Sequence, residues 1–305
     1  MFNVQQAIRR SLFWLTLAIA VALLPGLAEP HPDVASQSRT PASNPSTAEH
    51  AAQTRPSASV ASDREAIARL TDELVLRMLD REALFTVIGG IKPMSTGFWS
   101  GVIDLEAPDL TAMKRVRSAL AALRTETPYA DVMAFDREYD GKRYVEGFVV
   151  DRASFAEALK RYASFFSRYA LTPSTHPAVV VATVERMPRL DRYRGYGVLF
   201  GYPSYAIDFF IQAALEQEQS GEFVERDFLH IPTFESPIGR FVYAVPRGHI
   251  RNADDERLAE FASEILIEYQ ERRAAAIDEQ GLGALGLLRR WRAERARLTT
   301  PNDYG

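Results

Sequence analysis

Residues 132–150 read VMAFDREYDGKRYVEGFVV and predict an antiparallel β-hairpin. Asp140-Gly141 stands between two runs rich in strand-forming residues, and Asp-Gly is a favoured two-residue type I′ turn. With that turn, Val132–Tyr139 pairs with Lys142–Val150, and Glu138 faces Arg143 across the ladder. Helical patterns precede and follow the hairpin. The sequence therefore predicts an α+β fold in which antiparallel hairpins pack with several helices.

Helices are expected on both sides of this hairpin. Ser62 or Asp63 can cap a helix in which apolar residues recur at helical spacing from Ile67 to Met78. Further helices are predicted over Leu110–Thr125, from a cap at Asp151, over Pro177–Glu185, after Pro203, and over Asp254–Ile277. The last of these shows one apolar face, formed by Leu258, Phe261, Ile265 and Tyr269.

Further strands are predicted from short apolar runs. Leu84–Ile91 and Gly195–Phe200 are of the length and composition found in buried strands. Phe228–Phe234 and Arg240–Val245 flank a Ser-Pro-Ile-Gly segment that suits a type I turn. That turn would make a second hairpin with His230 opposite Val245.

The first 28 residues have the order of a secretory signal peptide. Arg9 and Arg10 precede an apolar run, Leu12–Leu24, and Ala28 ends a small-x-small cleavage site. The run is shorter than the ~20 residues that comfortably span a bilayer. An uncleaved anchor in the inner membrane is the alternative. We therefore expect an exported bacterial protein of the periplasm or the cell surface.

Composition divides the remaining chain into three parts. Residues 29–61 are rich in Ala, Ser, Pro and Thr and have no aromatic residue, which is typical of a disordered linker. Residues 62–280 carry the periodic apolar patterns and are expected to form one α+β globular domain. Residues 281–305 are expected to be a glycine hinge followed by a basic C-terminal helix.

Composition and motifs also exclude several kinds of site. The chain has 305 residues and no cysteine, so disulfides, thiolate nucleophiles and cysteine-ligated metals are excluded. Its formal net charge is −4, whereas nucleic-acid binding needs a concentrated basic face. Neither HExxH nor GxSxG occurs. We expect no metal, no cofactor and no nucleic-acid partner.

The loop GGIKPMSTG, residues 89–97, is a candidate site for a small anionic ligand. Glycines let backbone N–H groups approach a ligand closely, and the lysine and hydroxyl residues add a positive charge and donors. A plain turn is the alternative, because GxxxxGK[ST] is absent and Pro93 has no N–H. The candidate ligand-binding residues are Gly89, Gly90, Lys92, Ser95 and Thr96.

One acidic residue, Asp208, stands inside the apolar segment 206–211 of the helix expected after Pro203. A buried carboxylate needs hydrogen bonds or a basic partner, which Arg192, Arg194 or a backbone turn could supply. We therefore consider Asp208 as a buried functional acid, with a purely structural role as the alternative.

The C-terminal helix, Ala284–Leu298, carries five arginines and one acid. Leu287, Leu288 and Trp291 can share a face, and a basic amphipathic helix with Trp can lie on an anionic membrane. In the alternative, which we favour, Leu288 and Trp291 pack on the domain while the arginines face water or pair with the acidic body.

Two short stretches, Ile88–Gly97 and the LFGYP segment Leu199–Pro203, resemble strings of an uncharacterised bacterial exported protein family. The resemblance implies no activity. We expect a non-catalytic binding or structural module that contacts an envelope component or a small anion. The alternative is a periplasmic or cell-surface hydrolase that uses carboxylates with His230 or Lys92. Whether the protein is an enzyme is left open, because the sequence places no two such groups in one cleft.

Overall fold

The computed structural model describes residues 58–124 and 128–299. The predicted signal peptide and all but the last residues of the predicted linker lie outside these ranges. One compact unit begins at Ala66, and it contains all the described strands.

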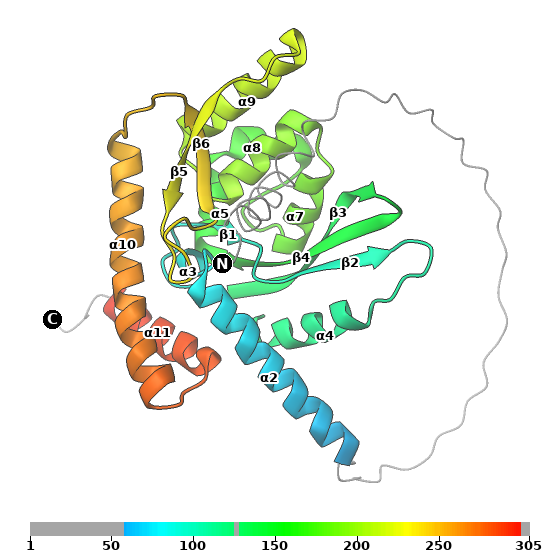
Figure 1. Ribbon diagram of the computed structural model, residues 1–305, viewed down its shortest axis with the longest axis vertical. Coiled ribbons are helices and arrows are strands. Elements are labelled where there is room, and N and C mark those ends of the chain that lie inside the picture. The colour runs from blue at the N-terminus through cyan, green and yellow to red at the C-terminus, as the bar shows by residue number, and fades with distance from the viewer. Residues whose placement is uncertain (1–57, 125–127, 300–305) are drawn as a thin grey trace, which may run out of the picture. The chain divides into compact units, whose positions relative to one another are not determined.

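An antiparallel sheet, whose strands differ in length, is built around β4 (Lys142–Asp151) and organises this unit (Figure 1). One edge of β4 pairs with β3 (Pro128–Tyr139). The other edge pairs with β2 (Ser100–Asp104) and then with β1 (Met94–Ser95). The fold is α+β, as the sequence predicts.

The hairpin turn between β3 and β4 is confirmed. Asp140 and Gly141 have φ values of 50° and 65°, as a type I′ turn requires. Glu138 lies opposite Arg143, and the two side chains form an ion pair. The ladder shifts register between Ala134 and Glu138, so a bulge interrupts the strand that the sequence predicts as regular.

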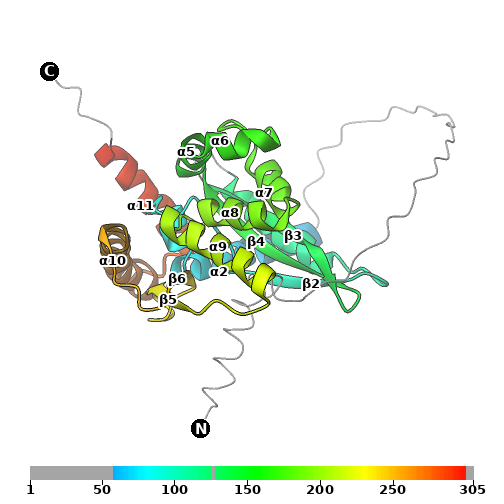
Figure 2. The same ribbon diagram turned by 90° about the horizontal axis from the view of Figure 1, so that it is seen from above.

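Helices cover both faces of this sheet (Figure 2). In chain order they are α2 (Ala58–Asp80), α3 (Leu84–Val87), α4 (Thr111–Leu120), α5 (Arg152–Arg161), α6 (Ala163–Phe166), α7 (Pro177–Glu185), α8 (Arg189–Leu199), α9 (Ser204–Ser220), α10 (Ala253–Arg273) and α11 (Ala284–Thr299). Short 3-10 turns follow α4 (Ala121–Leu123) and α6 (Ser167–Tyr169), and a π-helical turn follows α10 (Ala274–Glu279). The start of α7 at Pro177 and the cap of α5 by Asp151 are confirmed.

The side chains of β4 alternate between two apolar cores. Val145 and Val149 face a core built with α2, α3, α4, α10 and α11. Phe148 and Val150 face a second core built with α5 to α9. Because successive residues of a strand point to opposite faces, one strand serves both cores.

Two predicted strands are wrong. Leu84–Val87 forms helix α3, whose residues are all buried, so no amphipathic period marks it in the sequence. Gly195 and Gly197 lie in helix α8. A Cβ added at either glycine would lie 2.8 Å from a side-chain carbon of Val184 or Ile207. These glycines therefore permit close helix packing and do not mark a strand.

The second hairpin forms, but in another register. It joins β5 (Arg226–Ile231) to β6 (Phe241–Pro246), and His230 faces Val242 instead of Val245. The connection is longer than the predicted four-residue turn. Pro232 cannot donate to the ladder, and the N–H of Glu235 donates to the carbonyl of Asp80 in α2. Contacts outside the hairpin therefore set its register.

Helix α10 starts from an Asn252 capping box and buries Ile265 and Tyr269 as predicted. Phe261, expected on the same buried face, is 57% exposed. Ala262 is buried in its place, so this part of the predicted stripe is wrong.

Helix α11 packs into the first core. Leu287, Leu288 and Trp291 are buried, and the Trp291 ring stacks on Tyr269 at a centroid distance of 6.2 Å. Trp291 also donates a 2.7 Å hydrogen bond to Glu268. The packing that we favoured for this helix is confirmed. Within the described ranges, no helix combines the length and apolar character that a membrane crossing needs.

Candidate functional site

Lys92 points into the domain and not toward solvent. The side chain is 1% exposed, and Nζ lies 3.4 Å from a carboxylate oxygen of Glu82. Nζ also lies 4.2 Å from the ring centre of Phe241 and 5.4 Å from that of Phe200. Burial lowers the pKa of Lys92, and the negative charge of Glu82 opposes that shift. The expectation that Lys92 presents its charge to an anion is therefore wrong.

The two hydroxyl residues of the loop have internal partners as well. Ser95 is fully buried, and its Oγ lies 2.7 Å from Oγ1 of Thr86. Thr96 hydrogen-bonds to the carboxylate of Glu146 on β4. Ser95 is therefore also a correction to the predicted anion site, because no ligand can reach it in this structure.

The glycines of the loop shape its backbone. Gly90 has a φ of 60°, which favours glycine. Gly89 packs so tightly against Ile265 of α10 that an added Cβ would clash. Of the five predicted ligand-binding residues, Gly89 is the one that lines a cavity described below. These contacts favour the plain-turn interpretation of the loop.

The two stretches that carry the family resemblance contact each other around Lys92. Gly201 has a φ of 72°, and a Cβ added there would lie 2.8 Å from the carbonyl oxygen of Ile91. Phe200 and Tyr202, on either side of Gly201, have ring centres 5.9 Å apart. Burial raises the pKa of Tyr202 well above its ordinary value, and Glu82 adds to that shift. The two stretches thus enclose one buried charge cluster.

Glu146 extends this cluster across the sheet. It is partly buried and shares the β4 face of Phe148 and Val150. Burial raises the pKa of Glu146 to about 7, the charge of Glu82 adds to the rise, and Thr96 and Arg240 oppose it. A carboxyl group that titrates near neutral pH can both give and take a proton, as acid–base chemistry requires. Its position at an inward-facing place in the strand alternation was a signal that sequence reasoning missed.

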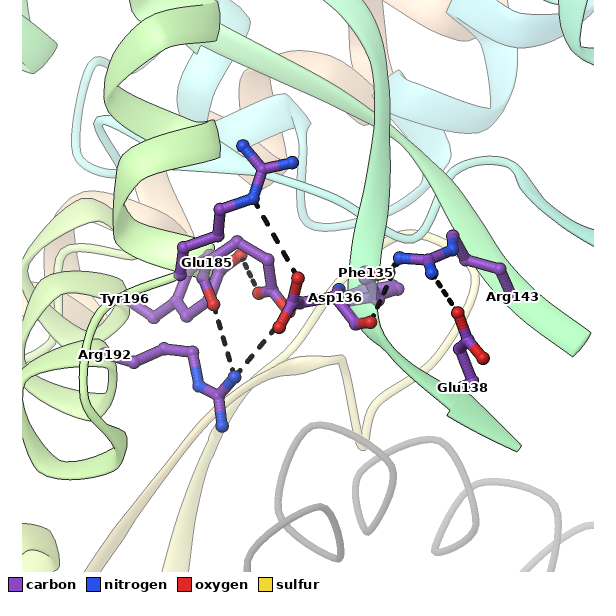
Figure 3. A network of polar contacts seen from close by, with 8 residues as sticks. Phe135, Asp136, Glu138, Arg143, Glu185, Arg192 and Tyr196 are labelled. Carbon is purple, nitrogen blue, oxygen red and sulfur yellow. Dashed lines mark hydrogen bonds and ion pairs between the residues drawn. The ribbon is translucent and has the colours of Figure 1, made fainter. Parts of the chain in front are cut away.

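A second buried carboxylate, Glu185, ties the helical layer to the β3 bulge (Figure 3). It accepts hydrogen bonds from the N–H of Asp136 at 3.0 Å and from Tyr196 Oη at 2.6 Å. Arg192 lies 3.8 Å from the carboxylate and donates to the Glu185 carbonyl at 3.2 Å. Every oxygen of Glu185 is therefore engaged. One of these contacts satisfies the N–H of Asp136, which lies in the bulged part of β3, and the others tie Glu185 to α8.

Asp208 is not buried. Its side chain is 61% exposed and forms a 2.8 Å ion pair with Arg194. The expected burial is therefore wrong, although Arg194 is one of the expected partners. The charged face of α9 points to solvent, and its apolar residues Ile207 and Ala213 face inward.

Two histidines, His249 and His230, have structural partners. His249 Nε2 lies 2.8 Å from the carboxylate of Asp255, which also accepts hydrogen bonds from Tyr205 and Tyr243. Burial of Asp255 opposes ionisation, but the hydrogen bonds from these side chains lower its pKa to about 2. Because Asp255 also belongs to the capping box of α10, this network fixes the start of that helix. His230 approaches the carbonyl of Gly239 at 3.4 Å.

A cavity of about 640 Å³ opens beside the loop, between α5, α10 and α11. We call it the Gly89 cleft. Its apolar lining comprises Gly89, Ile91, Phe261 and Ile265, and its charged lining comprises Arg161, Glu264, Glu268 and Arg295. Glu268 already binds Trp291, Arg272 and Arg295. Arg161 and Glu264, in contrast, have no ion-pair or hydrogen-bond partner among the described residues.

The described residues contain no group of three or more His, Asp or Glu side chains that could hold a metal ion. The geometry therefore offers three features: an enclosed charge cluster, an acid that titrates near neutral pH, and an open cleft of mixed charge. Comparison with known proteins does not choose among them, since no family model, no curated protein and no solved structure matches the chain.

Proposed function

We propose that this protein is a non-catalytic binding module of the bacterial cell envelope and that its ligand occupies the Gly89 cleft. The observation that carries this proposal is the pair Arg161 and Glu264, two opposite charges that have no partner among the described residues and lie in a cleft whose lining also includes apolar residues. Ligand sites are concave, largely apolar and equipped with a few polar groups that orient the ligand. The enclosed Lys92–Glu82 pair serves as the rigid support of the loop at the cleft's edge.

The lining indicates the chemistry of the ligand. Arg161 can bind a carboxylate through two parallel hydrogen bonds. Glu264 can bind an ammonium group, and the exposed ring of Phe261 offers apolar contact. A small amino acid or the free end of a short peptide carries all three features. This ligand class differs from the simple anion that the sequence suggests.

Titration of the mature protein with the dipeptide Leu-Phe tests the proposal. We expect saturable binding by calorimetry, and weaker binding of the N-acetylated and C-amidated dipeptides by about tenfold each, because each loses one charged hydrogen bond. Arg161→Gln should bind the C-amidated dipeptide as tightly as free Leu-Phe. Glu264→Gln should bind the N-acetylated dipeptide as tightly as free Leu-Phe. Glu260→Gln, on the same helix but outside the cleft, is the matched control. Absence of saturable binding, or equal affinities in all variants, would contradict the proposal.

Acid–base hydrolysis is the second candidate function, and the pKa of Glu146 near 7 is the observation that favours it. In this reaction Glu146 would transfer the proton, with the buried Lys92–Glu82 pair setting its electrostatic surroundings. Chromogenic ester and glycoside substrates can be compared for wild type and Glu146→Gln. The hydrolase proposal requires a rate that changes around pH 7 and is lost in the variant; equal rates in both proteins would remove it.

A further inference from the structure

A smaller cavity, of about 270 Å³, lies between the first turn of α5 and the start of α7. We call it the Arg152 pocket. Its polar lining comprises Arg152, Ser174, Thr175 and His176, and Phe155 is part of its apolar lining. None of the described residues that line it is acidic, so its charge has one sign, unlike that of the Gly89 cleft.

Arg152 has an unmet hydrogen-bonding group at this pocket. Its Nε is buried and has no hydrogen-bond partner among the described residues. The guanidinium lies over the ring of Tyr129 at 5.1 Å. Leaving a buried charged donor unpaired is costly, so such a group calls for an explanation. The buried Nε is itself out of reach of a ligand, so a ligand would contact the other N–H groups of the guanidinium, whose side chain lines the pocket.

Two acids of this region, Asp151 and Asp131, are already engaged. The carboxylate of Asp151 accepts a 3.0 Å hydrogen bond from the N–H of Ser154 and forms a 3.2 Å ion pair with Arg292. Asp131, which accepts a hydrogen bond from Tyr129, forms ion pairs with Arg117 and Arg124. The positive charge of Arg152 is therefore not neutralised by either carboxylate.

His176 supplies a second donor with a defined orientation. Its Nδ1 accepts a hydrogen bond from the N–H of Ala178 at 3.3 Å, so the proton of the neutral ring lies on Nε2. The ring packs edge-on against Tyr129 at 4.8 Å, so that His176 and Arg152 contact the same aromatic ring. Ser174 and Thr175 add hydroxyl groups next to His176, and α7 directs the positive end of its dipole to this region.

We propose that the Arg152 pocket binds a tetrahedral oxyanion, a phosphate or sulfate group. Ser174 and Thr175 both hydrogen-bond to the hydroxyl of Thr172, at 3.0 and 3.1 Å, which leaves one hydroxyl proton of the three for a ligand. A tetrahedral anion accepts hydrogen bonds in several directions, which matches a guanidinium, an imidazole N–H and a hydroxyl around one cavity. The cavity is larger than the ion, which leaves space for the alcohol part of a phosphate ester. This site goes beyond the proposed ligand of the Gly89 cleft and shares no residue with it.

Calorimetric titration of the mature chain with inorganic phosphate, at constant ionic strength, tests the site. We expect saturable binding by wild type and a dissociation constant raised about tenfold or more in Arg152→Gln, because a charged hydrogen bond is lost. His176→Asn should weaken binding less. Asparagine keeps the capping acceptor for α7 while it removes the Nε2 donor. Arg186→Gln is the matched control, since Arg186 is a 74% exposed arginine at the other end of α7.

Four further measurements, the last of them with acetate, complete the test. Thermal unfolding of each variant without phosphate shows whether it is folded. Competition by sulfate supports the site, and tighter binding of glycerol 3-phosphate supports it and identifies an ester as the ligand. The proposal is overturned if wild type shows no saturable phosphate binding, if folded Arg152→Gln binds phosphate like wild type, or if acetate binds as tightly as phosphate.

Discussion

The backbone of Gly201 lies against the carbonyl oxygen of Ile91, with room for a hydrogen atom but not for a methyl group. This contact joins the turn before α9 to the loop that holds Lys92. It also fixes Phe200 and Tyr202 on either side of the buried charge cluster. The loop at the edge of the Gly89 cleft is therefore positioned by a segment more than 100 residues away in the sequence.

Gly201→Ala should lower the free energy of unfolding by more than the cost of placing an alanine in the left-handed backbone region. A non-glycine residue in the left-handed region costs about 1–2 kcal/mol, and the new Cβ would also clash with Ile91. Gly221→Ala is the matched control, because Gly221 has a φ of 75° but no atom within 4 Å of an added Cβ. Urea unfolding of both variants separates the two effects. Equal losses would show that the contact with Ile91 relaxes at no cost.

Removing the charge of Lys92 should destabilise the protein because Glu82 would remain buried without its partner. Lys92→Met is expected to lower the free energy of unfolding by about 3 kcal/mol or more. The double variant Glu82→Leu/Lys92→Met should regain a large part of that loss, since neither charge is then buried. Chemical denaturation of wild type, both single variants and the double variant measures the coupling. Additive losses would mean that the two charges do not stabilise each other.

Glu146 should make stability fall as pH rises. Its pKa is about 7 in the folded protein and near 4.5 when unperturbed. Between these values the folded state binds more protons than the unfolded state, so the free energy of unfolding decreases from about pH 4.5 to above pH 7. We expect the free energy of unfolding of Glu146→Gln, relative to that of wild type, to increase by roughly 2 kcal/mol between pH 5 and pH 8. A difference between the two proteins that stays constant across this range would contradict the raised pKa.

Export with cleavage after Ala28 remains a prediction from the sequence. The envelope fraction of expressing bacteria should contain a protein whose N-terminal sequence begins at Glu29. An intact N-terminus, on a protein that only detergent extracts, would instead establish the uncleaved anchor.

Membrane contact through α11 can now be tested without disturbing the core. Deleting residues 284–305 would remove Leu287, Leu288 and Trp291 from the first core and is expected to unfold the domain. Arg289 and Arg290 are exposed, so changing both to Gln leaves the packing intact. If the basic face binds membranes, sedimentation with vesicles rich in phosphatidylserine should be lost in this variant and in high salt. No sedimentation of wild type would end this proposal.

Local chemistry accounts for the predictions that the structure confirms. The Asp140-Gly141 turn needs two left-handed residues, the cap at Asp151 needs an acceptor for a free helix N–H, and Pro177 fits the first turn of a helix. Each of these requirements is met within a few residues of the chain. The fold class followed from such elements because their order already distinguishes hairpins from helices.

The candidate site could not be predicted from any short stretch of the sequence, because it depends on contacts between distant segments. Leu84–Val87 is buried on all sides, so its apolar run fits a strand and a helix equally well. The register of His230 depends on contacts of the connecting loop, and the direction of Lys92 depends on Glu82 and Phe241, which lie in other elements. Apart from the strand alternation at Glu146, no local pattern in the sequence distinguishes Glu146, Arg152 or Arg161 from charges that face solvent. Local residue chemistry was therefore enough to predict the Asp140-Gly141 turn, the cap at Asp151 and the fold class. Which charges are neutralised, and which line a cavity, depends on tertiary packing, because burial and pairing arise only when distant segments pack together.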